Sequence, residues 1–301
     1  MSQSTSAELH TDPTQFPGLD VYVVAGNPIS HSKSPAIHQR FAEQSKQQMH
    51  YGRLQPALGE FRAAAQSFFA AGGKGMNVTV PFKLDAQALA DVLTPRAKLA
   101  GAVNTLRVED GKIFGDNTDG AGLVRDLLAQ GIQLKDSRIL LLGAGGASRG
   151  VLGPLLEQLP KELVIANRSN AKADELVQLF SDLAHSLHVV LQVVALSDLE
   201  SAGKVTPFDL IINATAAGLS DQSPIGEAAA RNIFIPKSFA YDMVYGKATA
   251  FMQQALHRGA RVSDGLGMLV EQAADAFLIW RGAKLANAID SRAVLAELRA
   301  S

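Results

Sequence analysis

The nine residues from Leu140 to Ser148 read LLLGAGGAS and carry the strongest signal for the fold. The apolar run that ends at Leu142 is typical of a strand in a parallel sheet, which is buried on both faces. Gly143 permits a tight turn, and Gly145 has no Cβ, so a pyrophosphate can approach the backbone at the N-terminus of the next helix. A glycine turn that only joins a strand to a helix is the simpler alternative. The order of strand, turn and helix favours a dinucleotide-binding site.

The residues after the next expected strand, 163–166, distinguish between the two nicotinamide cofactors. They are Asn167, Arg168 and Ser169, without the carboxylate that usually holds the ribose hydroxyls of NAD. Arg168 can pair with a 2′-phosphate, and Lys172 lies one helical turn further on the same side. A solvated basic helix start is the alternative. Because positive charge is unfavourable at a helix N-terminus, the pattern favours a function and predicts NADP rather than NAD.

Strands alternate with helices along most of the chain, which predicts an α/β fold. The apolar and turn patterns indicate strands at 21–25, 51–54, 75–80, 103–108, 112–114, 138–142, 163–166, 189–194, 210–212 and, as the last one, 238–243. Helices are expected to begin near Pro35, 61, 85, 146 and 170. The last 37 residues are helical without strands, so we expect them to return to the first domain, with a ligand cleft between two lobes.

Composition narrows the class of protein. A chain of 301 residues is long for one domain, and a net charge of −1 gives no basic excess to attract nucleic acid or an anionic membrane. The absence of cysteine excludes disulfides, a thiolate nucleophile and cysteine-ligated zinc. The seven histidines are scattered, so we expect no metal site. The Ser/Thr-rich start is expected to be a disordered tail without a signal peptide, and the protein to be cytoplasmic.

Four polar segments stand out in the first half, at residues 27–35, 77–83, 101–105 and 115–120. Lys83 follows a strand at the edge where the active sites of α/β proteins lie. Ser32 and Ser34 alternate, so an extended backbone would present both hydroxyls to a carboxylate or polyol. Taken singly, Ser34 and Asp119 are more typical of helix caps, and a lone lysine is more often solvated.

Taken together and in order, these segments resemble the shikimate dehydrogenase family. The resemblance extends over nearly all the chain after the tail and rests on SHSKSP at 30–35, NVTVPFK at 77–83, GAVNT at 101–105, DNTDG at 116–120, the glycine turn, NRS at 167–169, NAT at 213–215, YDMVY at 241–245 and DGLGM at 264–268.

The resemblance implies an enzyme that reversibly reduces 3-dehydroshikimate to shikimate with NADPH, in the biosynthesis of chorismate and the aromatic amino acids. Lys83 would be the acid/base residue, and Asp119 would bind the substrate and pair with that lysine. The other substrate-binding residues implied are Ser32, Ser34, Thr79, Asn104, Tyr245 and Gln272. The implied cofactor-binding residues are Gly143, Ala144, Gly145, Gly146, Ala147, Asn167, Arg168, Ser169, Lys172, Met243 and Gly265.

The resemblance also implies a domain organisation. We expect a tail at 1–17, a substrate-binding and catalytic α/β domain at 18–119 and 265–301, and a Rossmann-like NADP-binding domain at 120–264. Two positions depart from the family's usual residues, since Lys172 replaces a common arginine and Ser169 replaces threonine. A monomer or homodimer that acts on a small molecule is expected.

Two alternatives stay open on the sequence. A related enzyme type accepts quinate and uses NAD, but it would be expected to carry an acidic residue near Arg168. A non-enzymatic sensor on the same fold would be suggested by loss of Lys83 or Asp119, and both are present.

Overall fold

A computed structural model describes residues 9–300 and divides the chain into two compact units. The first unit runs to Gly122 and resumes at Leu269, and the second comprises Leu123–Met268. Each unit has its own six-stranded sheet with helices, so the predicted α/β class is confirmed. Within residues 9–300, no helix combines the length and apolar character needed to cross a bilayer.

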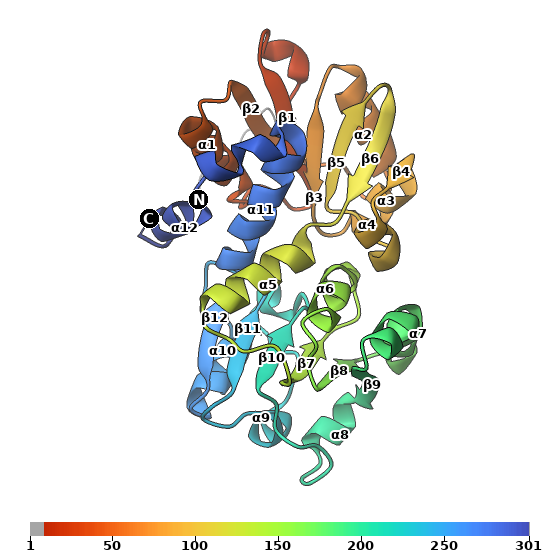
Figure 1. Ribbon diagram of the computed structural model, residues 1–301, viewed down its shortest axis with the longest axis vertical. Helices are drawn as coiled ribbons and strands as arrows, with labels where there is room; N and C mark the ends of the chain where they lie inside the picture. The colour runs from red at the N-terminus through yellow and green to blue at the C-terminus, as the bar shows by residue number, and fades with distance from the viewer. Residues whose placement is uncertain (1–8, 301) are drawn as a thin grey trace. The chain divides into compact units, whose positions relative to one another are not determined.

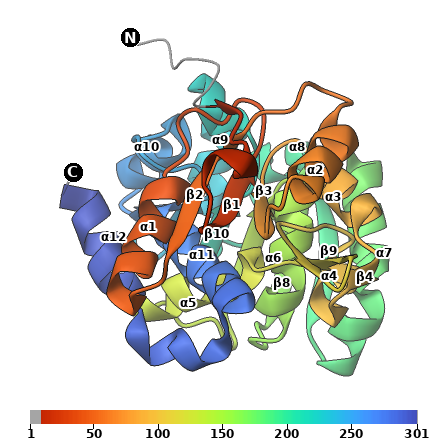
Figure 2. The same ribbon diagram turned by 90° about the horizontal axis from the view of Figure 1, so that it is seen from above.

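The sheet of the first unit has the strand order β2-β1-β3-β5-β6-β4. Strands β2, β1 and β3 are parallel and lie side by side in Figure 2, whereas β5 and β6 form an antiparallel hairpin beside β3. The strands are β1 (Asp20–Ala25), β2 (Met49–Leu54), β3 (Gly75–Val78), β4 (Val92–Leu93), β5 (Thr105–Glu109) and β6 (Lys112–Asp116).

Helices bury both faces of this sheet. Val23 of β1 packs in a cluster with Phe68 of α2, and on the other face Tyr22 stacks on Trp280 of α11 with ring centroids 4.7 Å apart. Phe41 of α1 joins a further cluster with α11 and α12. The helices are α1 (Ser34–Ser45), α2 (Phe61–Ala70), α3 (Lys83–Leu89), α4 (Pro95–Ala100) and α12 (Ser291–Ala300), with α5 (Asp119–Ala129) and α11 (Leu266–Arg281) continuing between the units along the chain.

The strand order explains why distant polar segments meet at one edge of this sheet. The order reverses at β1, which has β2 on one side and β3 on the other, and ligand sites of open α/β sheets lie beyond the carboxyl ends of strands at such a point. Because β5 is antiparallel to β3, it starts at that same edge, and β6 ends there. In register, Asn77 pairs with Thr105, and Thr105 pairs with Asp116.

The sheet of the second unit is entirely parallel, in the order β12-β11-β10-β7-β8-β9 (Figure 1). The order reverses between β7 and β10, which is the doubly wound arrangement of dinucleotide-binding folds. Its strands are β7 (Arg138–Leu142), β8 (Glu162–Asn167), β9 (Val190–Ala195), β10 (Leu210–Asn213), β11 (Phe239–Asp242) and β12 (Arg261–Asp264). Its helices are α6 (Gly146–Leu156), α7 (Asn170–Ser186), α8 (Leu196–Glu200), α9 (Glu227–Ile233) and α10 (Ala250–His257).

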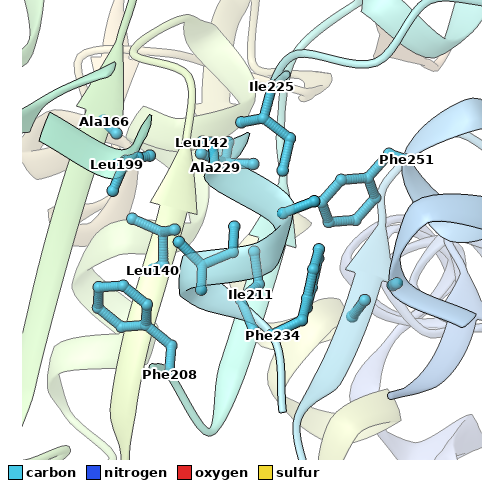
Figure 3. Packing of buried hydrophobic residues seen from close by; sticks show 14 of the residues in the cluster. Leu140, Leu142, Ala166, Leu199, Phe208, Ile211, Ile225, Ala229, Phe234 and Phe251 are labelled. Carbon is cyan, nitrogen blue, oxygen red and sulfur yellow. The ribbon is translucent and has the colours of Figure 1, made fainter. Parts of the chain in front are cut away.

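The central strand of the second unit shows why its sequence is continuously apolar. Leu140 and Leu142 lie in a buried cluster with Phe208, Phe234 and Phe251 (Figure 3). The residues between and before them, Ile139 and Leu141, are also fully buried. A strand covered on both faces has no position for a polar residue.

Some predicted elements are wrong. The segment 238–243 is not the last strand, because β12 follows it as a parallel edge strand beside β11. The predicted strand 75–80 ends at Val78, and the helix expected near 85 begins at Lys83. The tail predicted at 1–17 is not disordered in its described part, because Thr11 N–H donates to the Arg53 carbonyl of β2 at 3.0 Å. Residues 1–8 lie outside the described chain.

Candidate active site

Lys83 and Asp119 form an ion pair at the shared edge of the first sheet. Lys83 is the first residue of α3, anchored by the preceding Phe82, whose ring stacks on Phe61. Asp119 opens α5, three residues after β6 ends. The two side chains are only 13% and 6% exposed, so water screens their attraction weakly. Asp119 is therefore bonded to other side chains and is not simply a helix cap.

Asn104 completes the surroundings of this carboxylate. Its Nδ2 donates to Asp119 Oδ1 at 2.9 Å, and it also lies 2.8 Å from Thr118 Oγ1 and 3.1 Å from Gln272 Oε1. Its Oδ1 accepts from the Thr118 N–H and the Thr105 hydroxyl, each at 2.9 Å. Lys83 takes the other carboxylate oxygen, so both oxygens of Asp119 have a donor. The structure thus brings four predicted residues together: Lys83, Asn104, Asp119 and Gln272.

A second buried polar group adjoins Asn104. Asn77 Oδ1 accepts from the Tyr51 hydroxyl at 2.7 Å and lies 3.1 Å from His38 Nε2. Burial lowers the pKa of His38 to about 3, so its ring is neutral at ordinary pH. Because Nδ1 has no hydrogen-bond partner and Nε2 faces an acceptor oxygen, we assign the ring proton to Nε2. Asn77 Nδ2 then faces Thr105 Oγ1 at 3.1 Å. Asn77 and Thr105 belong to segments that the sequence marked as polar, but a role for His38 or Tyr51 was not predicted.

Ser32 and Ser34 are both buried beside the start of α1. The extended backbone expected between them is wrong, because Lys33 has φ −84° and ψ −5° and is itself the N-cap of α1. Pro35 fits the first turn of the helix, so the helix already includes Ser34 instead of being capped by it. The Ser32 hydroxyl accepts from the Ser34 N–H at 3.3 Å. Thr79, partly buried, follows β3 at the same edge of the sheet.

The glycine turn of the second unit leaves open space at the N-terminus of α6. Gly143 has φ +109°, and a Cβ there would lie 3.1 Å from the γ-methyl group of Thr215. Gly145 caps α6, and no atom lies within 4 Å of the position a Cβ would take, which leaves open space before the free N–H groups. The buried Ser148 hydroxyl donates to the Gly143 carbonyl at 2.9 Å and closes the turn. The remaining predicted turn residues are Ala144, Gly146 and Ala147.

The end of β8 presents the predicted basic residues to solvent. Arg168, Ser169 and Lys172 are exposed, and the Asn167 side chain donates to the Ser169 carbonyl at 2.9 Å. Within residues 9–300, neither Arg168 nor Lys172 forms an ion pair with a carboxylate. The two cations are thus available for an anion at the carboxyl end of β8, the strand beside β7.

Met243 and Gly265 adjoin each other in the second unit. A Cβ on Gly265 would lie 2.3 Å from the Met243 carbonyl oxygen, so a larger residue would displace this backbone. The fully buried Asp242 fixes the chain that follows β11. Its carboxylate accepts from the Val244 N–H at 3.0 Å and from the Thr249 hydroxyl at 2.6 Å. Tyr245, partly buried, follows in the same segment.

Each unit also matches a known family. The shikimate dehydrogenase substrate binding domain matches residues 24–106, and the shikimate / quinate 5-dehydrogenase family matches residues 126–227.

Several curated proteins are similar over almost their whole length. The chain is 54% identical over 285 residues to a shikimate dehydrogenase (NADP(+)) of Dechloromonas aromatica, covering 93% of this chain and 98% of the relative. It is 51% identical over 284 residues to the same enzyme of Vibrio atlanticus, covering 93% and 97%. A shikimate 5-dehydrogenase structure from Thermus thermophilus, in complex with NADP(H) and shikimate, superposes with a TM-score of 0.79 at 32% identity, covering 94% and 99%. The chain belongs to the shikimate dehydrogenase family.

Proposed function

We propose that the protein catalyses the reversible, NADPH-dependent reduction of 3-dehydroshikimate to shikimate. The observation in this chain that carries the proposal is the largely buried Lys83–Asp119 pair, bonded to Asn104 beside Gln272. Relatives about 50% identical are named shikimate dehydrogenase (NADP(+)), which supports the substrate and the cofactor together.

Lys83 supplies the acid in this proposal. Negative charge develops on the C3 ketone oxygen as hydride adds to the carbonyl carbon, and an ammonium group beside that oxygen stabilises the charge. Lys83 then gives a proton to the oxygen and regains one from solvent, and the reverse sequence operates in shikimate oxidation. Asp119 holds the lysine Nζ in place and accepts a hydrogen bond from a substrate hydroxyl.

The remaining polar residues fix the substrate. Gln272 offers its amide oxygen to a ring hydroxyl, because the two donors near that oxygen lie 3.1 and 3.4 Å away. Asn104 Nδ2 has two hydrogens and three acceptor oxygens within reach, so it would bind a ring hydroxyl by giving up one of these contacts. We assign the substrate carboxylate to the hydroxyls of Ser32 and Ser34, and we propose Tyr245 of the second unit as a further substrate-binding residue. Thr79 binds the carboxylate or a ring hydroxyl beside them.

The cofactor fits the second unit. The open space at Gly145 and the N–H groups at the start of α6 would hold the pyrophosphate, and Arg168 and Lys172 would pair with the 2′-phosphate. The segment 143–147 and residues Asn167 and Ser169 complete this half of the site, and Met243 with Gly265 lines the nicotinamide position. When bound, NADPH supplies the hydride.

The cellular setting is part of the same proposal. A net charge of −1 and the absence of cysteine suit an enzyme of the reducing cytoplasm that acts on a small molecule, with no nucleic-acid or membrane partner. We propose a monomer or homodimer, with a catalytic domain at 18–119 and 265–301 and a cofactor domain at 120–264.

Initial rates test the function. Shikimate and quinate are each assayed with NADP and with NAD, following absorbance of the reduced cofactor. Rapid turnover of shikimate with NADP alone supports the proposal. Comparable rates with quinate or NAD would place the protein with the dual-specificity relatives, and no turnover with any pair would favour a sensor.

A further inference from the structure

Thr105 lies between the two buried polar groups of the first unit and touches both. Its hydroxyl is 3.1 Å from Asn77 Nδ2 and 2.9 Å from Asn104 Oδ1. The residue is 1% exposed, so water cannot replace either hydrogen bond without opening the sheet. We propose that Thr105 is a positioning residue, whose hydroxyl orients the Asn104 side-chain amide toward Asp119 and thereby places the Lys83–Asp119 pair for catalysis.

The donors and acceptors leave one arrangement of this chain of hydrogen bonds. Tyr51 donates to Asn77 Oδ1, and the neutral ring of His38 donates to the same oxygen through Nε2. The Asn104 backbone carbonyl, which can only accept, lies 3.4 Å from Asn77 Nδ2, so the N–H groups of this amide face the side of Asn104 and Thr105. A hydroxyl has a single hydrogen, so Thr105 accepts from Asn77 and donates onward to Asn104 Oδ1.

This direction decides which end of Asn104 faces the carboxylate. With Thr105 and the Thr118 N–H both donating to Asn104 Oδ1, the Nδ2 end points at Asp119 Oδ1, 2.9 Å away. The flipped amide would place its oxygen against the carboxylate and its N–H groups against two donors. Every donor in the chain from Tyr51 onward points toward Asp119, and aligned hydrogen bonds strengthen one another in a buried site.

The sheet explains why the relay needs residue 105 in particular. Asn77 and Thr105 are directly opposite in the antiparallel pair of β3 and β5, so their side chains lie on one face. Asn104 directly precedes Thr105 and turns to the edge where β6 ends. A β-branched residue suits the strand, but only threonine among such residues carries a hydroxyl.

The test compares Thr105→Val with Thr105→Ser, using the rates with shikimate and NADP, and it rests on the proposed function. Valine keeps the shape and removes the hydroxyl, whereas serine keeps the hydroxyl and removes a methyl group. We expect kcat to fall roughly tenfold in Thr105→Val and the KM for shikimate to rise by less than about threefold, because the hydroxyl acts only through Asn104, one of several residues proposed to bind the substrate. Thr105→Ser should stay within about twofold of the wild type.

Thr94→Val is the matched control. It removes a hydroxyl that donates to Asp116 at 2.6 Å in the same unit, while Arg96 still holds that carboxylate with two hydrogen bonds. This variant should lower Tm and leave kcat unchanged. If Thr105→Val does not fold, Thr105→Ala removes the same hydroxyl without the added methyl contact.

Two results would overturn the positioning role. One is a wild-type kcat in folded Thr105→Val or Thr105→Ala, whatever the Tm, and the other is a Thr105→Ser variant as slow as Thr105→Val. Failure of the proposed function is a separate result, since wild-type protein would then turn over none of the substrates.

Discussion

Lys83 and Arg168 are both basic residues that follow a parallel strand at its carboxyl end, yet their surroundings differ sharply. Lys83 is largely buried and already paired with Asp119, which Asn104 holds in turn. Arg168 is exposed, and within the described chain it has no carboxylate partner. A buried cation needs a counter-charge even in the free protein, because water does not solvate it. An exposed cation is solvated by water and needs no counter-charge until an anion binds. The comparison predicts that the catalytic pair is preorganised and that the 2′-phosphate site is assembled when the ligand binds.

The largest expected effect on the reaction rate comes from a substitution in the preorganised Lys83–Asp119 pair. Lys83→Ala should lower kcat by about 10²- to 10⁴-fold, the usual contribution of general acid catalysis, and should leave the Kd for shikimate within a few-fold. Steady-state rates and calorimetric titration measure the two quantities. Lys98→Ala, an exposed lysine of α4, is the control and should be silent. Full activity in Lys83→Ala would reject the acid/base role.

A substitution of the exposed Arg168 should have a smaller effect than one of Lys83, and that effect should be selective for NADP over NAD. Arg168→Ala should raise the KM for NADP by about 10- to 100-fold, since a hydrogen bond to a charged group is lost, and should leave the KM for NAD nearly unchanged. The measurement is the ratio of the two KM values. The exposed Lys161, which lies before β8 at the opposite end of that strand, provides a control as Lys161→Ala. Equal changes for both cofactors would contradict pairing with a 2′-phosphate.

The buried His38 should also make the free energy of unfolding depend on pH. Its folded pKa of about 3 lies below the unfolded value of 6.5, so the unfolded chain binds the extra proton between these values. The contribution of His38 to the free energy of unfolding is therefore fully present above pH 6.5. It is lost as the pH falls, by about 1.4 kcal/mol per pH unit between these two pKa values. His38→Gln, which keeps an N–H donor but does not titrate, should lose this slope.

Urea denaturation of both proteins at several pH values between 7.5 and 4.5 measures the difference. Because the other titrating groups are common to the two chains, their contributions cancel. Parallel curves for wild type and His38→Gln would show that the ring is not held neutral in the folded protein.

The cofactor site around the glycine turn and Arg168 can be predicted from the sequence more completely than the buried network around Lys83 and Asp119. Strand β7 and the start of α6 have the bounds that the apolar run and the glycine turn predict, because both signals are local. Arg168 and Lys172 likewise lie only four residues apart in sequence, Arg168 directly after β8 and Lys172 in the first turn of α7. The class of fold and the polar segments of the first unit follow from such local patterns too.

The buried network depends on pairing that no local pattern encodes. Thr105 meets Asn77 only through the antiparallel register of β5 with β3, and His38 has the spacing of an ordinary core residue of α1. Strand β12 escapes prediction for the same reason, since its four residues RVSD become a strand by pairing with β11. Position in the sheet, and not residue type, gives these segments their role.

The smallest expected effect would sharpen the comparison by improving the exposed site. Lys172→Arg keeps the charge but adds a planar fork that binds phosphate through two hydrogen bonds. The KM for NADP should fall by about two- to fivefold, the range of an exposed ion pair, and raised salt should reduce this gain. The KM for NAD should not change. An equal improvement with NAD would mean that residue 172 acts on the helix and not on the 2′-phosphate. No improvement at any salt concentration would show that Lys172 does not reach the phosphate, so that Arg168 alone distinguishes the two cofactors.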